Sequence, residues 1–411
     1  MADNFLLFLL AISGAILASI TGTIPGMHVN NLISILIPLF PILSRELGIE
    51  GLAVLIVSMA VAHTFVNTIP STYLGAPDPS TGSILPAHRL LLMGRGHMAV
   101  VLTLAGSILS LILSLMILPM FMLVLPILSQ IIERNTSIVL SGILLFLIAS
   151  ERSYYRRIYA MFIVLLSGIL GIYVLDLGFL DQDTALFPSF VGLFTAPTII
   201  HSVLTSGKVP RQIIRVRTRR KELMRGSLAG TVAGIISGVI PGVSPSIAAG
   251  LIRKSRNERE YLVTIGGINT AEAMYAMVML YLLGATRSGP AAALKSIFRD
   301  FSGDLFVVLI GTALVSGGLA TILAMFLSRK FSSFVEKINY RLVAISVLFG
   351  LSSAIFLISG VRGILVEITA LGIGILPIYF GCRRGSCMGF LLVPIAMRSL
   401  GLNELILPVF N

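Results

Sequence analysis

Long apolar runs separated by short polar loops set the pattern of this chain. A run of about 20 apolar residues is long enough for one helix to cross a bilayer. We expect crossing helices at about 98–127, 136–150, 158–176, 185–205, 303–328, 342–360, 362–381 and 387–408. The alternation of polar and apolar residues that marks transmembrane β-strands does not occur along these runs. The pattern predicts an all-α polytopic membrane protein.

Two further apolar segments carry a Pro-Gly pair in their interior, and such a pair ends a continuous helix. Residues 226–252 contain Pro241-Gly242, and residues 4–43 contain Pro25-Gly26. The later segment is too long for one span and too short for two, and basic clusters flank both of its ends. Because Lys and Arg stay in the cytoplasm, both ends are expected on one side. We therefore predict two re-entrant hairpins whose tips lie at membrane depth.

An internal duplication relates the two hairpins. Residues 12–26 align without gaps on 228–242, with six identities that include both Pro-Gly pairs. Broken helices are expected to follow at 51–93 and 260–297, and each contains Leu-Gly-Ala at its interruption. With five crossings in each half, the two halves have opposite orientations. The sequence thus predicts two inverted-topology repeats with re-entrant Pro-Gly hairpins and broken helices.

Charge indicates how the chain lies in the membrane. It carries 30 Lys and Arg against 18 Asp and Glu, and most of the basic residues fall in loops on one side of the predicted topology. The positive-inside rule explains this excess without nucleic-acid binding. We expect a first membrane repeat at 1–207, a basic cytoplasmic linker at 208–225 and an inverted second repeat at 226–411. The predicted location is the cytoplasmic membrane, with the N-terminus outside.

Inverted repeats with interrupted helices are typical of secondary transporters, which bind their substrate near the midplane. The chain has no GxxxxGK[ST] motif for ATP, so the expected driving force is an ion gradient or the substrate's own gradient. Half-helix N-termini attract anions through free N–H groups and the helix dipole. The candidate substrate-binding residues at the interruptions are Pro25, Gly26, His28, Asn30, Asn31, Ser80, Thr81, Pro241, Gly242, Ser244, Ser246, Arg287 and Ser288. Simple helix capping is the alternative role for the serines and prolines.

Ionisable groups inside a membrane are costly and mark candidate sites. Arg287 lies in the second interruption, where it can bind a carboxylate or phosphate bidentately or pair with Asp78 or Glu272. The candidates for coupling to a proton or to Na⁺ are His63, Asp78, Asn269, Thr270 and Glu272. Packing and snorkelling are the alternative roles for the histidine and the glutamate. We expect no other cofactor and no resident metal, and Cys382 and Cys387 are expected to be free thiols.

At these motifs the chain resembles the large membrane subunit of the tripartite tricarboxylate transporters, in a short, archaeal-type version. The matching stretches are GTIPG (22–26), MGRGHMAV (93–100), GVIPGVSPSIAAG (238–250), TAEAMYAM (270–277) and LGATRSG (283–289). The family's Pro-Glu-Ala is Ala271-Glu272-Ala273 here, and its usual Asp-Gly is Pro86-Ala87. The resemblance implies uptake of an organic anion driven by an ion gradient, with a small membrane subunit and an extracytoplasmic binding protein as partners.

Two other functions stay open at this point. Paired Pro-Gly hairpins also resemble the polyprenyl-phosphate transporters with IPGVSGG-type motifs, so a lipid phosphate is the alternative anion. An intramembrane enzyme is the third class, but the chain has no HExxH, no GxSxG and no carboxylate pair at helical spacing. We therefore predict a protein that is not an enzyme. Membrane lipids are partners in every case, and the sequence is compatible with a homodimer.

Overall fold

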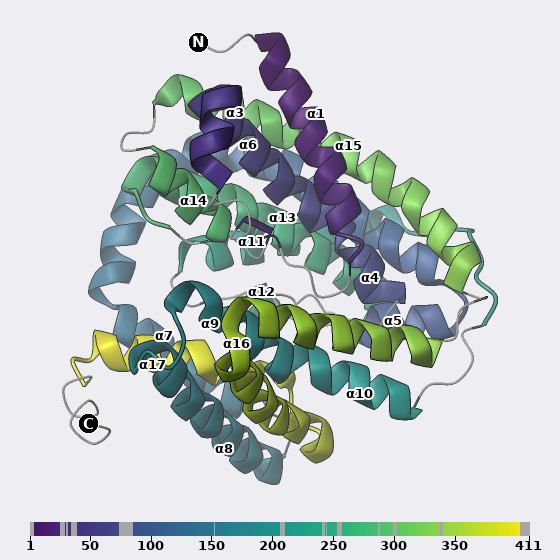
Figure 1. Cartoon of the computed structure of the whole chain (residues 1–411), viewed down its shortest axis with the longest axis vertical. Helices are drawn as coiled ribbons and strands as arrows, with labels where there is room; N and C mark the ends of the chain where they lie inside the picture. Colours follow the sequence, from purple (N-terminus) through teal and green to yellow (C-terminus); the bar gives the residue numbers. More distant parts are fainter. Residues whose placement is uncertain are drawn as a thin grey trace.

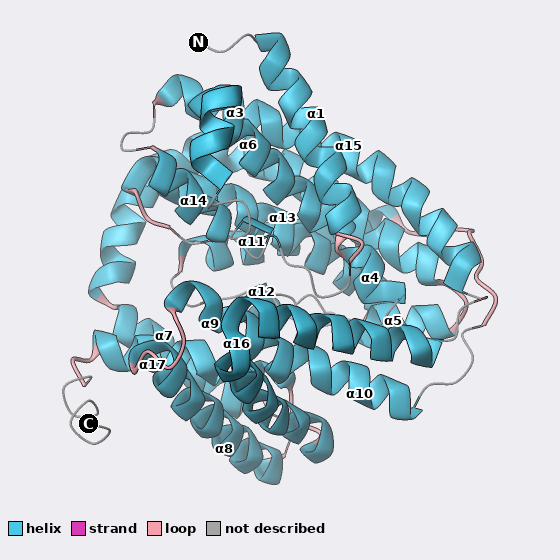
Figure 2. Cartoon of the chain, viewed as in Figure 1, coloured by secondary structure: helices cyan, strands magenta, loops and turns pink. Residues whose placement is uncertain are grey.

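The computed structural model describes residues 4–24, 29, 32–33, 39–73, 85–151, 153–205, 210–240, 243, 245–252, 257–286, 288–298, 302–335, 337 and 340–402. Across these ranges all the regular elements are helices (Figure 2). The α-helices are α1 (Asn4–Thr21), α3 (Phe40–Val66), α4 (Thr68–Tyr73), α5 (Leu85–Leu92), α6 (Gly96–Arg134), α7 (Thr136–Ala149), α8 (Tyr154–Gly171), α9 (Gln182–Phe190), α10 (Ala196–Thr205), α11 (Arg220–Val239), α12 (Pro245–Ile252), α13 (Glu258–Leu283), α14 (Gly289–Ile297), α15 (Gly303–Val335), α16 (Tyr340–Phe380) and α17 (Gly389–Ser399). Two π-helices, η2 (Ile172–Asp176) and η3 (Val191–Thr195), and a 3-10 helix, η4 (Arg384–Met388), complete the set.

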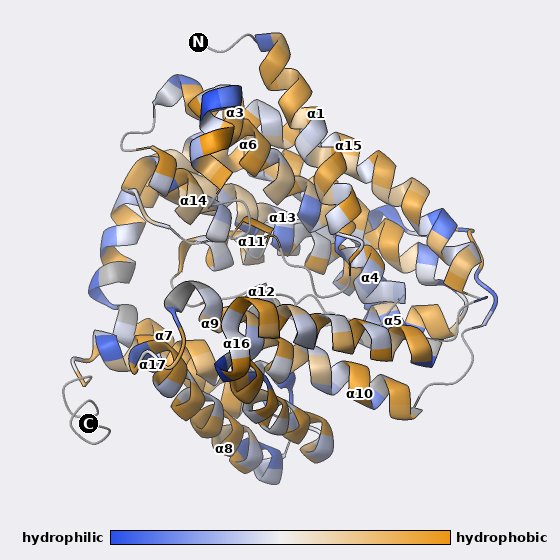
Figure 3. Cartoon of the chain, viewed as in Figure 1, coloured by the Kyte–Doolittle hydropathy of each residue, from blue (hydrophilic) through white to orange (hydrophobic). Residues whose placement is uncertain are grey.

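Many of these helices expose apolar side chains to their surroundings. Eight helical segments in the described part of the chain are long and apolar enough to cross a membrane. Large hydrophobic side chains such as Leu123, Leu357 and Phe349 are more than 70% exposed, and apolar colouring covers the outer helices (Figure 3). Such a surface suits lipid and not water. The prediction of an all-α polytopic membrane protein is therefore confirmed.

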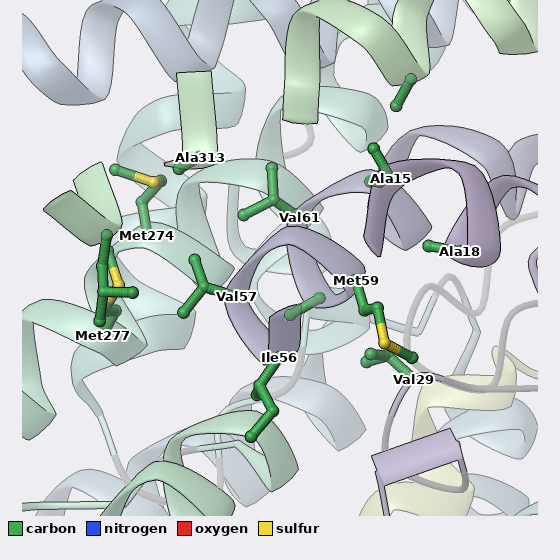
Figure 4. Packing of buried hydrophobic residues seen from close by; sticks show 14 of the residues in the cluster. Ala15, Ala18, Val29, Ile56, Val57, Met59, Val61, Met274, Met277 and Ala313 are labelled. Atoms are coloured by element: carbon green, nitrogen blue, oxygen red, sulfur yellow. The ribbon is translucent and has the colours of Figure 1, made fainter. Parts of the chain in front are cut away.

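The helices form two groups, each with its own apolar core. One core joins α1, α3, α6, α13 and α15, and α3 lies at its centre. Figure 4 shows Ile56, Val57 and Val61 of α3 between Ala15 of α1 and Met274 of α13. The other core joins α7, α8, η3, α12, α16 and α17 (lower part of Figure 1).

Helices α11 and α13 contribute residues to both cores, and α6 packs on them with very small spacing. A Cβ at Gly106 would overlap the carbonyl oxygen of Val263, and one at Gly266 would overlap that of Thr103. Ser107 Oγ donates to the Gly266 carbonyl oxygen at 3.1 Å, which ties α6 to α13. Small residues at these positions let the helix backbones touch, as in other membrane proteins.

Packing between the two halves of the chain is reciprocal. In one pairing α3 packs on α15 while α13 packs on α6, and in another α8 packs on α17 while α16 packs on η3 and α9. The helices α6 and α15 begin at residues 96 and 303, and α9 and α17 begin at 182 and 389, so both pairs are 207 residues apart. The helices that make these contacts thus recur at the same separation in sequence.

The structure changes several expected boundaries. The span predicted to run to residue 408 ends at Ser399, because Gly401 takes φ +70 and the Leu402 N–H bonds the Met397 carbonyl oxygen in a Schellman turn. Helix α11 begins at Arg220, inside the predicted linker, and its start is capped by the Glu222 carboxylate on the Arg219 N–H. Gly360, with φ +61, divides α16 into the two helices expected at 342–360 and 362–381.

Candidate functional site

Helices α3 and α13 meet at a polar contact. Thr64 on α3 and Thr270 on α13 place their Oγ1 atoms 3.3 Å apart, although 206 residues separate them in sequence. Thr270 is fully buried, and its hydroxyl also reaches the Gly266 carbonyl oxygen at 3.3 Å. This hydroxyl pair is a buried polar contact between two largely apolar helices. Thr270 was a predicted coupling residue, whereas Thr64 was not singled out.

Asn269 precedes Thr270 on α13 and is 6% exposed. Its Oδ1 accepts no hydrogen bond from any described residue. A buried amide oxygen without a donor is energetically unfavourable unless a ligand, an ion or water satisfies it. The carbonyl-type oxygen of an amide and the hydroxyl of a threonine are both ligands that Na⁺ and other hard cations accept.

The predicted coupling residues His63 and Glu272 lie on these same two helices. His63 is buried on α3, at 1% exposure, one residue before Thr64. Glu272 is half-buried on α13, where the α11 backbone approaches it closely. A Cβ at Gly238 would lie 3.0 Å from the Glu272 carbonyl oxygen, so the glycines of α11 allow this close packing.

The interruption between α13 and α14 is described on both sides of Arg287. Gly284 caps α13, and the Lys295 ammonium donates to the Gly284 carbonyl oxygen at 2.6 Å. Ser288 begins α14, and its Oγ accepts the Ala291 N–H at 3.3 Å. The hydroxyl of Ser288 therefore has the capping role that was the alternative to ligand binding. Its own helix, α14, has nine residues.

Most of the predicted anion-binding residues lie outside the described residues. These are Pro25, Gly26, His28, Asn30, Asn31, Ser80, Thr81, Pro241, Gly242, Ser244 and Arg287. The coupling candidate Asp78 also lies outside the described residues. Ser246 lies in α12, whose backbone is described at that position. Val243, beside the second Pro-Gly pair, is buried, and the Ser237 hydroxyl donates to its carbonyl oxygen at 2.9 Å. These predicted anion-binding roles stay predictions.

A second buried polar cluster escaped the sequence analysis. The Tyr73 hydroxyl at the end of α4 lies 3.0 Å from Ser328 Oγ and 2.6 Å from Ser332 Oγ on α15. His97 Nδ1, at the start of α6, lies 2.9 Å from the same Ser328 Oγ. All four side chains are at most 2% exposed. Single Ser, Tyr and His residues in apolar runs carried no periodic signal that would have brought them together.

Comparison with known proteins identifies the family. The model of the Tripartite tricarboxylate transporter TctA family matches residues 8–389. This chain belongs to that family. An uncharacterized protein of Methanocaldococcus jannaschii is 28% identical to this TctA-family chain over 393 residues, which cover 93% of the chain and 96% of the relative. No solved structure matches the chain.

Membership of the TctA family bears on the role of the contact between α3 and α13. TctA-family proteins are membrane transporters, so the buried polar contact between α3 and α13 lies in a protein of a transporter family. The suspected resemblance to the large membrane subunit is therefore confirmed. The predicted free thiols are also confirmed, because neither Cys382 nor Cys387 forms a disulfide.

Proposed function

We propose that this TctA-family protein is a secondary transporter of an organic anion with carboxylate groups. In this proposal the anion binds near the midplane, where the half-helix N-termini and Arg287 supply positive potential. An ion gradient drives its movement, and the protein itself catalyses no reaction. A small membrane subunit and an extracytoplasmic binding protein deliver the substrate, as the family's tripartite name implies.

The reciprocal helix packing supports an inverted-repeat architecture for this transporter. Two of the main cross-half pairings have an equivalent: α1 packs on α15 as α11 packs on α6, and α3 packs on α15 as α13 packs on α6. A chain of two equivalent halves with an odd number of crossings in each has oppositely oriented halves. The halves can then exchange their conformations, and the site opens alternately to either side. The N-terminus lies outside and the basic linker inside in this arrangement.

The observation that carries the proposal is the meeting of α3 and α13 through buried polar groups. The Thr64–Thr270 contact joins equivalent helices of the two halves, which is where the site of an inverted-repeat transporter is expected. Asn269 adds an oxygen that has no donor among the described residues, at the same level of α13. We assign the coupling Na⁺ or proton to this region, with Asn269, Thr270, Glu272 and His63 as its candidate groups.

Transport by the purified chain tests this function. Proteoliposomes are loaded with unlabelled citrate, and uptake of labelled citrate or succinate is measured under an imposed Na⁺ or pH gradient. Wild-type protein is expected to accumulate one of these anions, and Arg287→Gln is expected to lose at least 90% of that uptake. Arg341→Gln, an exposed arginine at the start of α16, is the matched control and should transport normally. Equal uptake by all three proteins would refute the assigned role of Arg287.

The coupling assignment is tested separately from the anion site. Thr270→Val keeps the shape of the side chain but removes the hydroxyl that faces Thr64. We expect this variant to require at least tenfold more Na⁺, or a larger pH gradient, for half-maximal uptake, with little change in the anion concentration required. An unchanged ion dependence in Thr270→Val would remove the α3–α13 contact from the coupling mechanism.

A further inference from the structure

A buried carboxyl group of the second helix group has no role in the function proposed so far. Glu367 lies in the second part of α16 and is 5% exposed. It is seven residues past the Gly360 turn, which at about 1.5 Å per residue is about 10 Å into the helix. The apolar, exposed neighbours Leu365 and Ile368 show that this part of α16 faces lipid on its other side. Glu367 is therefore an acidic residue within a membrane-spanning segment.

The contacts of Glu367 do not suit an ionised carboxylate. Its Oε1 accepts one hydrogen bond, at 2.7 Å, from the Ser352 hydroxyl on the first part of α16. Among the described residues no basic side chain forms an ion pair with it. The comparison with Asp176 is informative, because Asp176 pairs with Arg398 of α17 at the rim of the same helix group. An unpaired carboxylate in an apolar interior is strongly unfavourable, so the neutral acid is the form that fits this site.

Charged and titratable groups on the neighbouring elements are engaged elsewhere. On α16 itself, Arg362 lies over the Phe179 ring, 5.9 Å from its centroid. Tyr159 of α8 stacks on Phe380, at the opposite end of α16. His201 of α10 is exposed, and η3, which packs on Glu367, contains no titratable residue. On η4, which packs on both α16 and η3, the Arg384 guanidinium donates to the Thr198 hydroxyl of α10. The side chain of Glu367 itself contacts the Ser352 hydroxyl.

The helix that packs on Glu367 is irregular in a way that often accompanies function. The π-helix η3 places Gly192 so close to α16 that a Cβ there would overlap the Glu367 carbonyl oxygen. Three residues later, the buried Thr195 hydroxyl has no hydrogen-bond partner among the described residues. Single-turn π-helices are concentrated at functional sites, because they cost stability and persist where they position a group.

A polar route from Glu367 to the turn at Gly360 needs a buried hydroxyl group beside that turn. One helical turn before Glu367, a Cβ at Gly363 would lie 2.5 Å from the Ser359 Cβ, so Ser359 packs beside that level of the helix. The Ser359 hydroxyl is buried and has no hydrogen-bond partner among the described residues. A hydroxyl group both donates and accepts, and can pass a proton along such a route.

We propose that Glu367 is a proton-binding site of this transporter, loaded from the Gly360 end of the α16 hairpin through Ser359 and held by Ser352. The carboxylate takes up one proton, which cancels its charge, and returns one proton when the packing of α16 on η3 opens to the other side. One positive charge therefore accompanies each cycle of this residue. The coupling role of Glu367 rests on the proposed transport function. The protonation of Glu367 does not depend on that function.

Infrared difference spectroscopy tests the protonation directly. The full chain in lipid nanodiscs is compared with Glu367→Gln at neutral pH, with Glu46→Gln, an exposed acid near the start of α3, as the matched control. We expect the wild type minus Glu367→Gln spectrum to contain a protonated carboxyl C=O band, and the control spectrum to contain carboxylate bands instead. Carboxylate bands in both difference spectra would overturn the proposal. Ser352→Ala should shift the protonated band, because it removes the hydrogen bond at Oε1.

Flux measurements test the coupling. In proteoliposomes, Glu367→Gln is expected to exchange labelled for unlabelled citrate at the wild-type rate but to lose accumulation driven by a pH gradient, while Glu367→Asp keeps part of it. Undiminished pH-driven accumulation in Glu367→Gln would overturn the coupling role. If wild-type protein exchanges none of the tested anions, the proposed function fails, and the infrared result still decides whether Glu367 binds a proton.

Discussion

Adding one methyl group to the interface of α11 and α13 should measurably destabilise the protein. In Gly230→Ala the new Cβ would lie 2.7 Å from the Thr264 carbonyl oxygen and 2.9 Å from the Gly267 Cα. Both are backbone atoms, so no side-chain rotation relieves the contact. The helices must separate by about 0.5 Å to restore ordinary packing, and an overpacked core typically costs about 1–3 kcal/mol. Separation also strains the 3.1 Å hydrogen bond from Ser110 Oγ to the Ser227 carbonyl oxygen.

The same substitution at an open position of a helix is the control. Gly311 of α15 has no atom within 4 Å of a built Cβ, so Gly311→Ala adds helix propensity without a clash. The chain has no Trp, but the buried thiol of Cys387 reacts with a fluorogenic maleimide only when the protein unfolds. In a Cys382→Ser background, we expect Gly230→Ala to unfold roughly 4 °C or more below the parent, and Gly311→Ala at or above it. Equal unfolding temperatures for the two alanine variants would refute the close-packing argument.

Three smaller effects follow from other contacts. Burial alone would raise the pKa of Glu222, but hydrogen bonds from Asn257 and the Arg219 N–H, with the charges of Arg259 and Arg219, lower it below its ordinary value of 4.5. The ionised form therefore stabilises the fold above that value and the effect is lost as pH falls through the lower folded pKa, so the destabilisation by Glu222→Gln should be largest at neutral pH and vanish in acid melts. Burial and the charge of Glu151 raise the pKa of Cys382, so its alkylation in the folded Cys387→Ser protein should accelerate as pH rises above neutrality. A double-mutant cycle on Asp176 and Arg398, measured by thermal unfolding, should give a coupling of only about 0.2–1 kcal/mol, because the arginine is 45% exposed.

The helical framework could be predicted because its signals are local. The lengths of the apolar runs predicted the first residues of α7, α8 and α15 to within a few residues. Gly284 and Pro290 marked the interval between α13 and α14. The predicted end of the last span, at residue 408, was wrong. The sequence stays apolar beyond Ser399, and the turn at Gly401 ends the helix. Hydropathy measures where a chain prefers lipid, and it does not register a tight turn within an apolar run.

The buried polar contacts could not be predicted, because they join residues far apart in sequence. Thr64 meets Thr270, and Tyr73 meets Ser328, only after four helices have taken their places. The predicted internal duplication aligned His63 with Glu272, and this alignment pointed to the two candidates together. Glu367 has no such signal, because the residue 207 positions earlier is Ala160 of α8. The sequence shows that an isolated acid lies in an apolar run, where it is energetically costly, but it does not show which residue the acid contacts.

This asymmetry separates the two proposed sites by function. Under the proposed inverted repeat, the α3–α13 contact lies between equivalent helices, so the groups there meet similar surroundings in the outward and inward conformations. Such a position suits a coupling ion that must be bound in both states. Glu367 accepts a hydrogen bond from Ser352, whereas the corresponding position of the first half is the apolar Ala160. An exchange of conformations between the two halves would therefore change the surroundings of the Glu367 carboxyl group. A group that must bind a proton on one side and release it on the other needs that change in environment. Substitutions at Glu367 should therefore alter the pH dependence of transport while the substrate concentration for half-maximal exchange stays constant. Substitutions at Thr270 or Asn269 should instead raise the ion requirement at the central contact, again with little change in the anion concentration required.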